Sequence, residues 1–390
     1  MNPYNTHHVV YILTKLELGG AQKVCLALMA GMKDQGFSSS LISGSQGALL
    51  EQALHFDSVF LIDDFKREIG FRLFIKELKA FVKMVHILRT LKQKHPTLVV
   101  HTHSTKAGFF GRWAAFFAGI KTRVHTIHGF GFHEGQNAFA WWFIYLLELI
   151  TVPITTHFIC VSLADATTGK RLFPGFDKKH SIIRAAVDGS RFAGHKEQIQ
   201  ARINQVKTTF TIGTISCFKE QKNIFDLLQA FSIVHSLANA QDIDVRLAII
   251  GDGEQRGVIE QWIAAHKLTN SIDLLGWQSN VAPIMRQWDL YAMSSLWEGL
   301  PCAIVEARLC RLPVVCYNVG GIAEVIIDGK NGFLIAPHNW QGLAEKINLV
   351  ISQPDLLHSL SRFDDNLAAF DLQNMVAIHA HLYRQLLSKQ

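Results

Sequence analysis

Two glutamates stand eight positions apart in the segment SSLWEGLPCAIVEA, and Gly299, Leu300 and Pro301 follow the first of them. The carboxylates of Glu298 and Glu306 can each accept several hydrogen bonds, which suits them to the hydroxyl groups of sugars. If a helix begins at the turn between them, its first N–H groups and its dipole attract an anion. The pattern therefore predicts a socket for a sugar nucleotide, with the diphosphate resting on backbone amides and a carboxylate on each side.

The surrounding sequence decides between such a site and two surface charges. An isolated pair of glutamates at this spacing is frequent by chance and would belong to a solvated loop and helix. Here LYAMSS (290–295) is typical of a strand, Pro301 suits the first turn of a helix, and a second apolar run, LPVVCY (312–317), comes next. A strand, a glycine turn and a helix in this order favour the binding site.

Both halves of the chain alternate short β-rich runs with helical ones, as in a parallel sheet covered on both faces. In the first half the expected strands are 9–13, 38–43, 97–103, 122–128 and 157–162. In the second half they are 209–218, 245–253, 271–277, 290–295 and 312–317. A polar stretch at 189–208 separates the halves. The sequence predicts an α/β protein of two doubly wound, Rossmann-like domains facing a cleft. We place the domains at 1–190 and 191–370, with a final helix at 371–390 that returns to the first domain.

Charge is unevenly distributed between the two halves. Residues 1–191 contain 22 Lys and Arg against 13 Asp and Glu, whereas residues 192–390 contain 16 against 19. A basic first half suggests an anionic partner, such as phosphates, nucleic acid or an anionic membrane. The helical segment 65–95 is rich in Lys and Arg, which predicts either a solvated basic face or docking on lipid headgroups. No helix-turn-helix, zinc or aromatic ribonucleoprotein signature accompanies the charge, which argues against nucleic acid.

The cysteines and the apolar segments bear on the compartment. The six cysteines lack metal-site spacing and mostly lie in apolar runs, which is typical of buried thiols in a reducing compartment. The N-terminus has no signal-peptide pattern, so we expect a cytoplasmic protein. Residues 138–154, AFAWWFIYLLELITVPI, are apolar except for Glu148 and slightly short for a bilayer span. We expect a buried or interfacial helix there, with membrane contact left open.

Region 289–335 closely resembles the donor-binding core of retaining glycosyltransferases of the GT-B fold, family 4 type. The resemblance extends over most of the chain. HTHSTKAGFFGRWAA and VHTIHGFGFHEG are similar to the N-terminal domain of bacterial members that build polysaccharides. SCFKEQKN resembles their basic loop, and GDGEQR and LLGW match in order. Each motif alone is weak, but the set in this order is specific.

The resemblance implies roles for individual residues of the second domain. Glu306 binds the nucleotide ribose, Glu298 contacts the donor sugar, and Leu300 with its neighbours offers backbone amides. Lys222 matches the lysine of a basic pair that holds the diphosphate. The usual arginine of that pair, five residues earlier, is Cys217 here. Lys219 is the substitute that the sequence offers.

Two further positions belong to the expected site. Trp277 lies in the loop on which the choice of nucleotide base depends. Gly19 and Gly20 follow the first strand, where glycine lets backbone approach a bound group closely. The resemblance places this loop under the donor diphosphate, although a plain turn is the alternative. The sequence has no GxGxxG fingerprint, which argues against a nicotinamide cofactor.

Histidines are dense at the strand ends of the first half, at positions 101, 103, 125, 128 and 133. An HxH pair can chelate a metal, but no convincing set of carboxylate or thiolate partners accompanies it. The resemblance implies that His128 faces the donor sugar, with Gly129 allowing close approach. On residues alone, a buried histidine with satisfied hydrogen bonds is an equal alternative.

Together these features predict a retaining glycosyltransferase that moves a hexosyl or N-acetylhexosaminyl group from a nucleotide-diphosphate sugar, expected to be a UDP-sugar. The expected acceptor is a hydroxyl of a lipid-linked glycan in capsule or lipopolysaccharide synthesis, at the inner face of the cytoplasmic membrane. His128, Lys222 and Glu298 are the expected catalytic residues. We expect no metal and no other cofactor. The alternatives are a sugar-nucleotide epimerase of the same fold and a non-catalytic sugar-nucleotide-binding protein.

Overall fold

The computed structural model describes residues 7–65, 74–133, 135–193 and 208–389. The chain divides into two compact units. The first unit comprises Met1–Ala186 together with Ala369–Gln390, and the second comprises Val187–Ala368. The first unit therefore contains both ends of the chain, because the last helix leaves the second unit and rejoins the first.

The described strands of the first unit form one parallel sheet of seven strands in the order β3-β2-β1-β4-β5-β6-β7. The strands are β1 (His7–Ile12), β2 (Phe37–Ser43), β3 (Val59–Leu61), β4 (Leu98–His103), β5 (Thr122–Ile127), β6 (His157–Cys160) and β7 (His180–Ile182). The central strands β1 and β4 are almost wholly buried, as expected for a sheet covered by helices on both faces.

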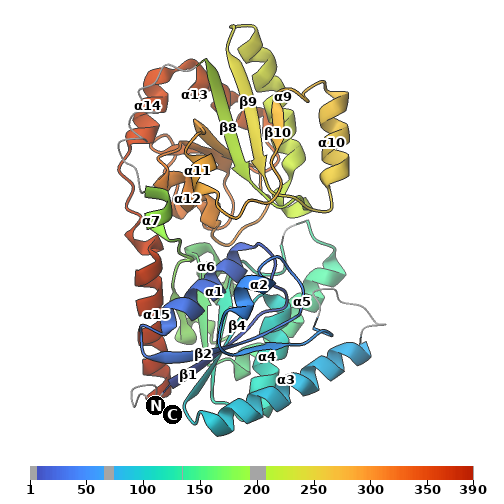
Figure 1. The fold of residues 1–390 in the computed structure, drawn as a ribbon, viewed down its shortest axis with the longest axis vertical. Coiled ribbons are helices and arrows are strands. Elements are labelled where there is room, and N and C mark those ends of the chain that lie inside the picture. Colours follow the sequence, from blue (N-terminus) through green and yellow to red (C-terminus); the bar gives the residue numbers. More distant parts are fainter. Residues whose placement is uncertain (1–6, 66–73, 134, 194–207, 390) are drawn as a thin grey trace. The chain divides into compact units, whose positions relative to one another are not determined.

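Helices cover both faces of this first sheet (Figure 1). They are α1 (Gly20–Met32), α2 (Leu50–Leu54), α3 (Phe74–Lys94), α4 (Thr105–Phe117), α5 (Ala138–Thr151), α6 (Leu163–Leu172) and α15 (Leu372–Leu387). Helix α4 packs between α3 and α5 in one layer. Helix α15 packs against α1, where Gly31 leaves room for the side chain of Val376.

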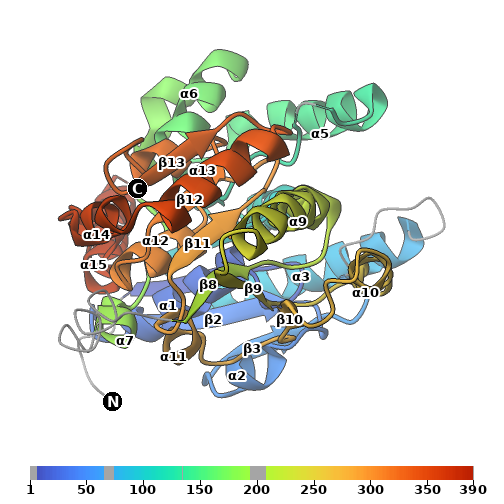
Figure 2. The same ribbon diagram turned by 90° about the horizontal axis from the view of Figure 1, so that it is seen from above.

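The second unit is built around a parallel sheet of six described strands in the order β10-β9-β8-β11-β12-β13. The strands are β8 (Thr209–Ile215), β9 (Asp244–Ile250), β10 (Ile272–Leu274), β11 (Leu290–Met293), β12 (Val314–Tyr317) and β13 (Gly332–Ile335). The helices are α7 (Gly189–Ala193), α9 (Ile224–Asn239), α10 (Arg256–Ala265), α11 (Ala282–Met285), α12 (Cys302–Leu309), α13 (Trp340–Ser352) and α14 (Pro354–Arg362). Helices α9 and α13 lie side by side on this sheet (Figures 1 and 2).

The two sheets confirm the predicted doubly wound α/β class. Each predicted strand is present, although several end earlier than expected. Helix α12 begins at Cys302, so Pro301 precedes the helix and does not lie in its first turn as predicted. Helix α3 accounts for 74–94 of the predicted segment 65–95, and residues 66–73 lie outside the described residues.

Candidate active site

Loops that follow the strands of the second sheet meet at its carboxyl edge. Because the sheet is parallel, β8, β9 and β11 all end there. The amide of Phe218 donates to Asp252 O at 2.9 Å and joins the loops after β8 and β9. The amide of Leu296 donates to Gln221 O at 2.8 Å and joins the loops after β11 and β8. Ligands of doubly wound sheets bind at this edge.

An ion pair between Lys222 and Glu298 lies at this edge. Lys222 ends the short 3-10 helix η4 (Glu220–Lys222), and its Nζ donates to Glu298 Oε1. The two side chains are only 19% and 9% exposed. Burial alone would lower the pKa of Lys222, but the neighbouring carboxylate outweighs burial and the pKa is raised. The structure therefore keeps Lys222 as an ammonium ion within the predicted site.

The ammonium group of Lys222 also lies close to the start of α12. Cys302 is the first residue of that helix, and Pro301 before it provides no side-chain cap. Cys217 and Cys302 are both near enough to Lys222 to raise its pKa. A cation beside the N–H groups of a helix N-terminus is a favourable environment for an anionic ligand.

Backbone contacts fix the loop that carries Glu298. The amide of Gly321 donates to Gly299 O at 2.7 Å. Gly320 has φ +57°, and a Cβ atom there would overlap Glu298 O. A glycine at position 320 thus lets the loop after β12 pack directly on the loop after β11. Leu300, in the loop after β11, is buried.

Glu306 is half-buried in the second turn of α12. The buried hydroxyl of Tyr291, on β11, lies within electrostatic range of both predicted glutamates. Burial raises the pKa of Tyr291, and the charges of Glu306 and Glu298 raise it further. The structure thus pairs Lys222 with Glu298 after β11, and it places Glu306 on the helix that follows their loop, within electrostatic range of the same tyrosine.

Lys219 and Trp277 lie on the same edge but farther along it. Lys219 immediately precedes η4, and its amide donates to Cys217 O at 2.9 Å. Trp277 follows β10, the outer strand of the sheet, and is 42% exposed. The amide of Gly251, after β9, donates to Gly276 O at 2.9 Å, which ties the Trp277 loop to the neighbouring loop.

Gly19, Gly20 and His128 belong to the first unit. Gly19 immediately precedes α1, and Gly20 is the first residue of that helix. His128 directly follows β5 and is half-buried. Gly129 has φ +96°, a backbone conformation that glycine adopts without strain. These three residues therefore lie at the carboxyl ends of β1 and β5, which share one edge of the first sheet.

His128 lies against a group of buried rings. Its Nε2 lies 3.0 Å from His103 Nδ1, and the rings of His103 and His101 are 4.2 Å apart. Burial lowers the pKa of His101 and His103 well below the usual histidine value, and the nearby histidines lower it further. Burial and His379 lower the pKa of His128 to about 4. These rings are therefore neutral at physiological pH.

The C-terminal helix α15 contributes two members of this histidine cluster that the sequence did not single out. Tyr383 OH lies 2.6 Å from His101 Nδ1, and His379 Nδ1 donates to Met375 O at 2.8 Å. Their four-residue spacing places both side chains on one helix face, which was the available signal. Within the described ranges, no group of three or more His, Cys, Asp or Glu side chains is placed to hold a metal ion.

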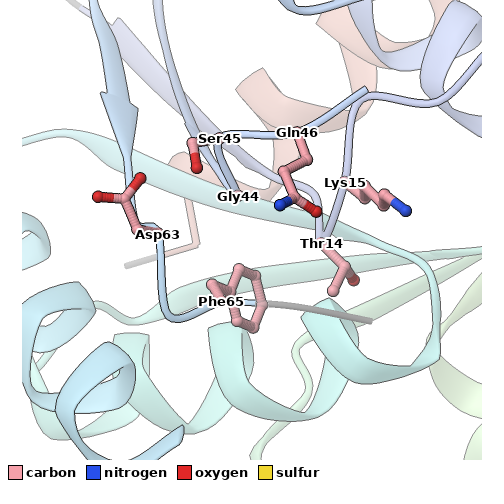
Figure 3. Close-up of a pocket in the computed structure, with 7 residues that line it drawn as sticks. All are labelled: Thr14, Lys15, Gly44, Ser45, Gln46, Asp63 and Phe65. Atoms are coloured by element: carbon pink, nitrogen blue, oxygen red, sulfur yellow. The ribbon is translucent and has the colours of Figure 1, made fainter. Parts of the chain in front are cut away.

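A small hollow, with about 10 Å³ open to the centre of a water-sized molecule, lies at the carboxyl ends of β1, β2 and β3 in the first unit (Figure 3). It is lined by Thr14, Lys15, Gly44, Ser45, Gln46, Asp63 and Phe65. A Cβ atom on Gly44 would collide with the carbonyl oxygens of Phe65 and Thr14. The hollow thus depends on a glycine where three loops meet, and none of its residues was predicted from the sequence.

Two family descriptions match adjacent parts of the chain. Glycosyltransferase Family 4 matches residues 18–191, and Glycosyl transferases group 1 matches residues 195–365. The boundary between the two matches coincides closely with the boundary between the two units. The chain is a glycosyltransferase of the family 4 type. It is therefore an enzyme, as predicted.

Curated relatives match this glycosyltransferase over most of its length. A UDP-Gal:alpha-D-GlcNAc-diphosphoundecaprenol alpha-1,3-galactosyltransferase of Escherichia coli is 29% identical over 82% of this chain and 81% of its own length. The capsular polysaccharide biosynthesis glycosyltransferase CapM of Staphylococcus aureus is 23% identical over 76% of each chain.

Solved structures match the fold. The HepE protein of Anabaena, crystallised with UDP and glucose, superposes with a TM-score of 0.77 at 21% identity, over 97% of this chain and 100% of that one. Sucrose-phosphate synthase of Thermosynechococcus elongatus gives a TM-score of 0.80 at 16% identity, over 98% and 100%. These similarities confirm the predicted GT-B fold of the glycosyltransferase.

Proposed function

We propose that this glycosyltransferase moves a sugar from a UDP-sugar to a hydroxyl of a lipid-linked glycan, with retention of anomeric configuration, in cell-surface polysaccharide synthesis. The observation that carries the proposal is the charged site of the second unit, where Lys222, Glu298 and the start of α12 come together. The name of the Escherichia coli relative supports the donor and acceptor classes, because it pairs UDP-Gal with a diphosphoundecaprenol-linked sugar.

The reaction breaks the bond between the sugar C1 and the β-phosphate oxygen. Negative charge then grows on the leaving diphosphate while the sugar centre becomes cationic. Lys222 and the N–H groups at the start of α12 stabilise that diphosphate, and stabilisation of this type is among the largest contributions to catalysis. Lys219 supplies further positive charge from the same loop. Because these groups stabilise the diphosphate, the proposed reaction does not require a metal ion.

The carboxylates bind hydroxyl groups. Glu306 accepts hydrogen bonds from the ribose, and Glu298 accepts them from the donor sugar while it orients Lys222. His128 contacts the donor sugar as a neutral imidazole, and Gly19 and Gly20 lie under the diphosphate. In the retaining reaction the acceptor oxygen attacks C1 on the face that the diphosphate leaves, and the acceptor proton passes to the departing phosphate oxygen.

The acceptor side belongs to the first unit. Asp63 and Gln46, which line a hollow that has room for about one water molecule, offer a carboxylate and an amide that suit single hydroxyl groups of a glycan (Figure 3). Lysines on the exposed surface of α3, at positions 76, 79 and 83, face anionic headgroups when the enzyme acts at the inner surface of the cytoplasmic membrane.

Thermal-shift measurements against UDP-, GDP- and ADP-sugars, with and without EDTA, test the donor. A ligand that binds the native state raises the melting temperature by mass action. We expect a shift with a UDP-sugar that EDTA does not remove. No shift with any donor, in conditions where a known donor-binding enzyme responds, would contradict donor binding and favour a non-catalytic protein that retains the fold. Turnover of donor into a second sugar nucleotide without acceptor would indicate an epimerase.

The product tests the rest of the proposal. Incubation with the responding donor and a prenyl-diphosphate-linked sugar should give a product whose anomeric coupling constant, measured by NMR, matches that of the donor. An inverted anomer would contradict the retaining mechanism and leave the donor assignment intact.

A further inference from the structure

Helix α5 is packed with its only charged residue facing the protein. Arg112 on α4 holds Glu148 with two parallel hydrogen bonds of 2.8 Å, from Nη1 to Oε1 and from Nη2 to Oε2. Arg112 Nη1 also donates to Thr155 Oγ1 at 2.9 Å, and Trp113 Nε1 donates to Thr151 Oγ1 at 3.1 Å. Glu148 and Thr151 thus anchor α5 on α4, and the hydroxyl of Tyr145 donates to Leu172 O on α6 at 3.2 Å.

The opposite face of α5 is exposed and apolar. It consists of large side chains at helical spacing, namely Phe139, Trp142, Phe143, Leu146 and Ile150. Phe139 is 81% exposed, Trp142 56% and Ile150 52%. Apart from the residues of this face and Ala138, no residue of α5 is exposed, so the face presents no charged group, and the indole N–H of Trp142 is the polar group among its large side chains. Single exposed apolar residues are ordinary, but a continuous stripe of this kind marks a surface that meets an apolar partner.

The neighbouring helices extend this apolar surface and add positive charge. On α4 the rings of Phe116 and Phe117 are exposed. On α3 the exposed apolar residues Ile75, Leu78 and Val82 alternate with exposed lysines at positions 76, 79 and 83. Since α4 packs against both α3 and α5, the three helices form one layer (Figure 1).

We propose that the outer face of α5 inserts into the headgroup and acyl boundary of an anionic lipid bilayer, with the lysines of α3 on the headgroups. Aromatic and aliphatic side chains beside basic ones match both zones of such a surface. A helix of 14 residues is roughly 21 Å long, shorter than the hydrocarbon core of about 30 Å. In the described part of the chain, no helix is both long and apolar enough to cross a membrane. Helix α5 therefore lies along the surface.

This inference rests on the proposed function in one respect, because a lipid-linked acceptor requires an enzyme at the bilayer. It differs from docking by lysines alone in its response to salt. Headgroup attraction by the lysines is screened as salt rises, since the screening length falls to about 3 Å at 1 M. Insertion of the apolar stripe does not depend on charge. We therefore expect a component of vesicle binding that persists at high salt and belongs to α5.

Co-sedimentation with vesicles of phosphatidylcholine and phosphatidylglycerol tests the proposal. We compare the full-length enzyme with the triple variant Phe139→Ser, Trp142→Ser, Ile150→Ser, whose changes lie on exposed positions. The control is Val258→Ser, at a half-exposed apolar position on α10 of the second unit. We expect the triple variant to lose binding by roughly tenfold or more for each side chain replaced, and the control to bind like the parent.

Tryptophan fluorescence quenching tests the insertion of α5 independently of the triple variant. Vesicles with brominated acyl chains quench tryptophans that reach the acyl boundary. We expect quenching in the parent enzyme that is absent from Trp142→Phe, a variant that keeps an apolar ring at the position. Equal quenching in both proteins would overturn the placement of α5.

Other results would also contradict the inference. No vesicle binding at low or high salt, or full binding by the triple variant, rules out insertion of α5. A dimer in analytical ultracentrifugation that the triple variant converts to a monomer, without vesicle binding, would assign the stripe to contact between two copies. The thermal shift with a UDP-sugar is measured in parallel. Its absence in the parent enzyme, with vesicle binding intact, would defeat the proposed function and leave this surface standing.

Discussion

The carboxyl edges of the two sheets differ in the charge of their buried basic side chains. In the second unit, a buried lysine is kept charged because Glu298 raises the pKa of Lys222. In the first unit, buried histidines are kept neutral because burial and their neighbours lower the pKa values of His101, His103 and His128. The two edges share strand topology and differ in the groups that follow the strands. The comparison shows that topology supplies the position of a site and side chains supply its charge.

The difference fits two tasks in the proposed reaction. A permanent ammonium can stabilise a diphosphate that gains negative charge as it leaves. A neutral imidazole can exchange hydrogen bonds with a sugar without adding a second positive charge beside the developing cationic centre. Changing the charge at each edge is therefore the direct way to test this comparison.

Removal of the charged amine should have the largest effect. In Lys222→Ala we expect turnover to fall by about 10²–10³-fold, because a preorganised cation is lost at the leaving group. Donor binding should fall less, since the helix N–H groups remain. Steady-state kinetics with the donor identified by thermal shift measures both quantities. Lys346→Ala is the matched control, because Lys346 forms an exposed ion pair on α13. A loss confined to donor affinity would contradict the role of Lys222 in the transition state.

Glu306→Ala should come next in size. We expect donor affinity to fall by roughly tenfold to a hundredfold, because the ribose loses a charged hydrogen-bond acceptor worth about 1.5–3 kcal/mol. Titration calorimetry with UDP alone isolates this effect from the sugar. Glu345→Ala, at an exposed position on the same unit, is the control. Unchanged UDP affinity would remove Glu306 from the ribose site.

The histidine edge predicts a loss of stability in acid. His128 and His379 have pKa values of about 4 in the folded protein, against 6.5 for an ordinary histidine. Between pH 4 and pH 6.5 the unfolded chain binds more protons than the folded protein. The free energy of unfolding therefore increases with pH, by up to about 1.4 kcal/mol per pH unit for each of these histidines. Denaturant unfolding from pH 4 to pH 7 measures the slope.

A variant assigns that slope to the cluster. His379→Phe removes one titrating ring and should flatten the pH dependence, whereas His55→Gln, at an exposed position, should leave it unchanged. At the other edge the sign reverses. The pKa of Lys222 is raised above 10.5, the value of an ordinary lysine. Its contribution to the free energy of unfolding is therefore fully present below pH 10.5 and is lost as the pH rises through the raised pKa. A parent protein equally stable at pH 4 and pH 7 would break the comparison between the edges.

The sequence was informative about the fold where apolar runs were long. The buried strands β1 and β4 follow from runs of β-branched residues, and the class follows from their alternation with helices. It missed β3, β7 and β13, which are edge strands of three or four residues. Length alone was not decisive, because β10 and β11 are equally short and were predicted. Apolar runs this short lack a clear period, so the sequence does not separate strands from loops among them. The exposed face of α5 was also out of reach, because a helix apolar on nearly all sides does not reveal which side is buried.

For the site, residue type and spacing selected Glu298 and Glu306, and the family resemblance selected Lys222, but neither paired the lysine with a glutamate. Lys222 and Glu298 are 76 positions apart and meet only because β8 and β11 are neighbours in the sheet. Consecutive strands usually pair, so this adjacency depends on a crossover that the sequence does not state. The sequence analysis expected the last helix to return to the first domain, but it did not identify which residues of α15 meet the histidines, because packing against β4 decides that.

The smallest expected effect concerns whether the charged edge has a second cation. Cys217 lies close enough to Lys222 to affect its pKa, so an arginine at this position would reach the same region. If Lys219 serves as that cation in the native chain, Lys219→Ala should reduce turnover by less than tenfold, because Lys219 is only partly buried and solvent screens its charge. Adding Cys217→Arg to Lys219→Ala should then restore turnover.

A double-mutant cycle of these two changes measures their coupling. We expect Cys217→Arg alone to change turnover little, because the site already has its cation, and the pair to couple strongly. Additive effects would mean that the two positions act independently. No change in either background would show that Lys222 and the helix N–H groups hold the diphosphate without Lys219, and the contrast between the edges would then rest on a single buried lysine.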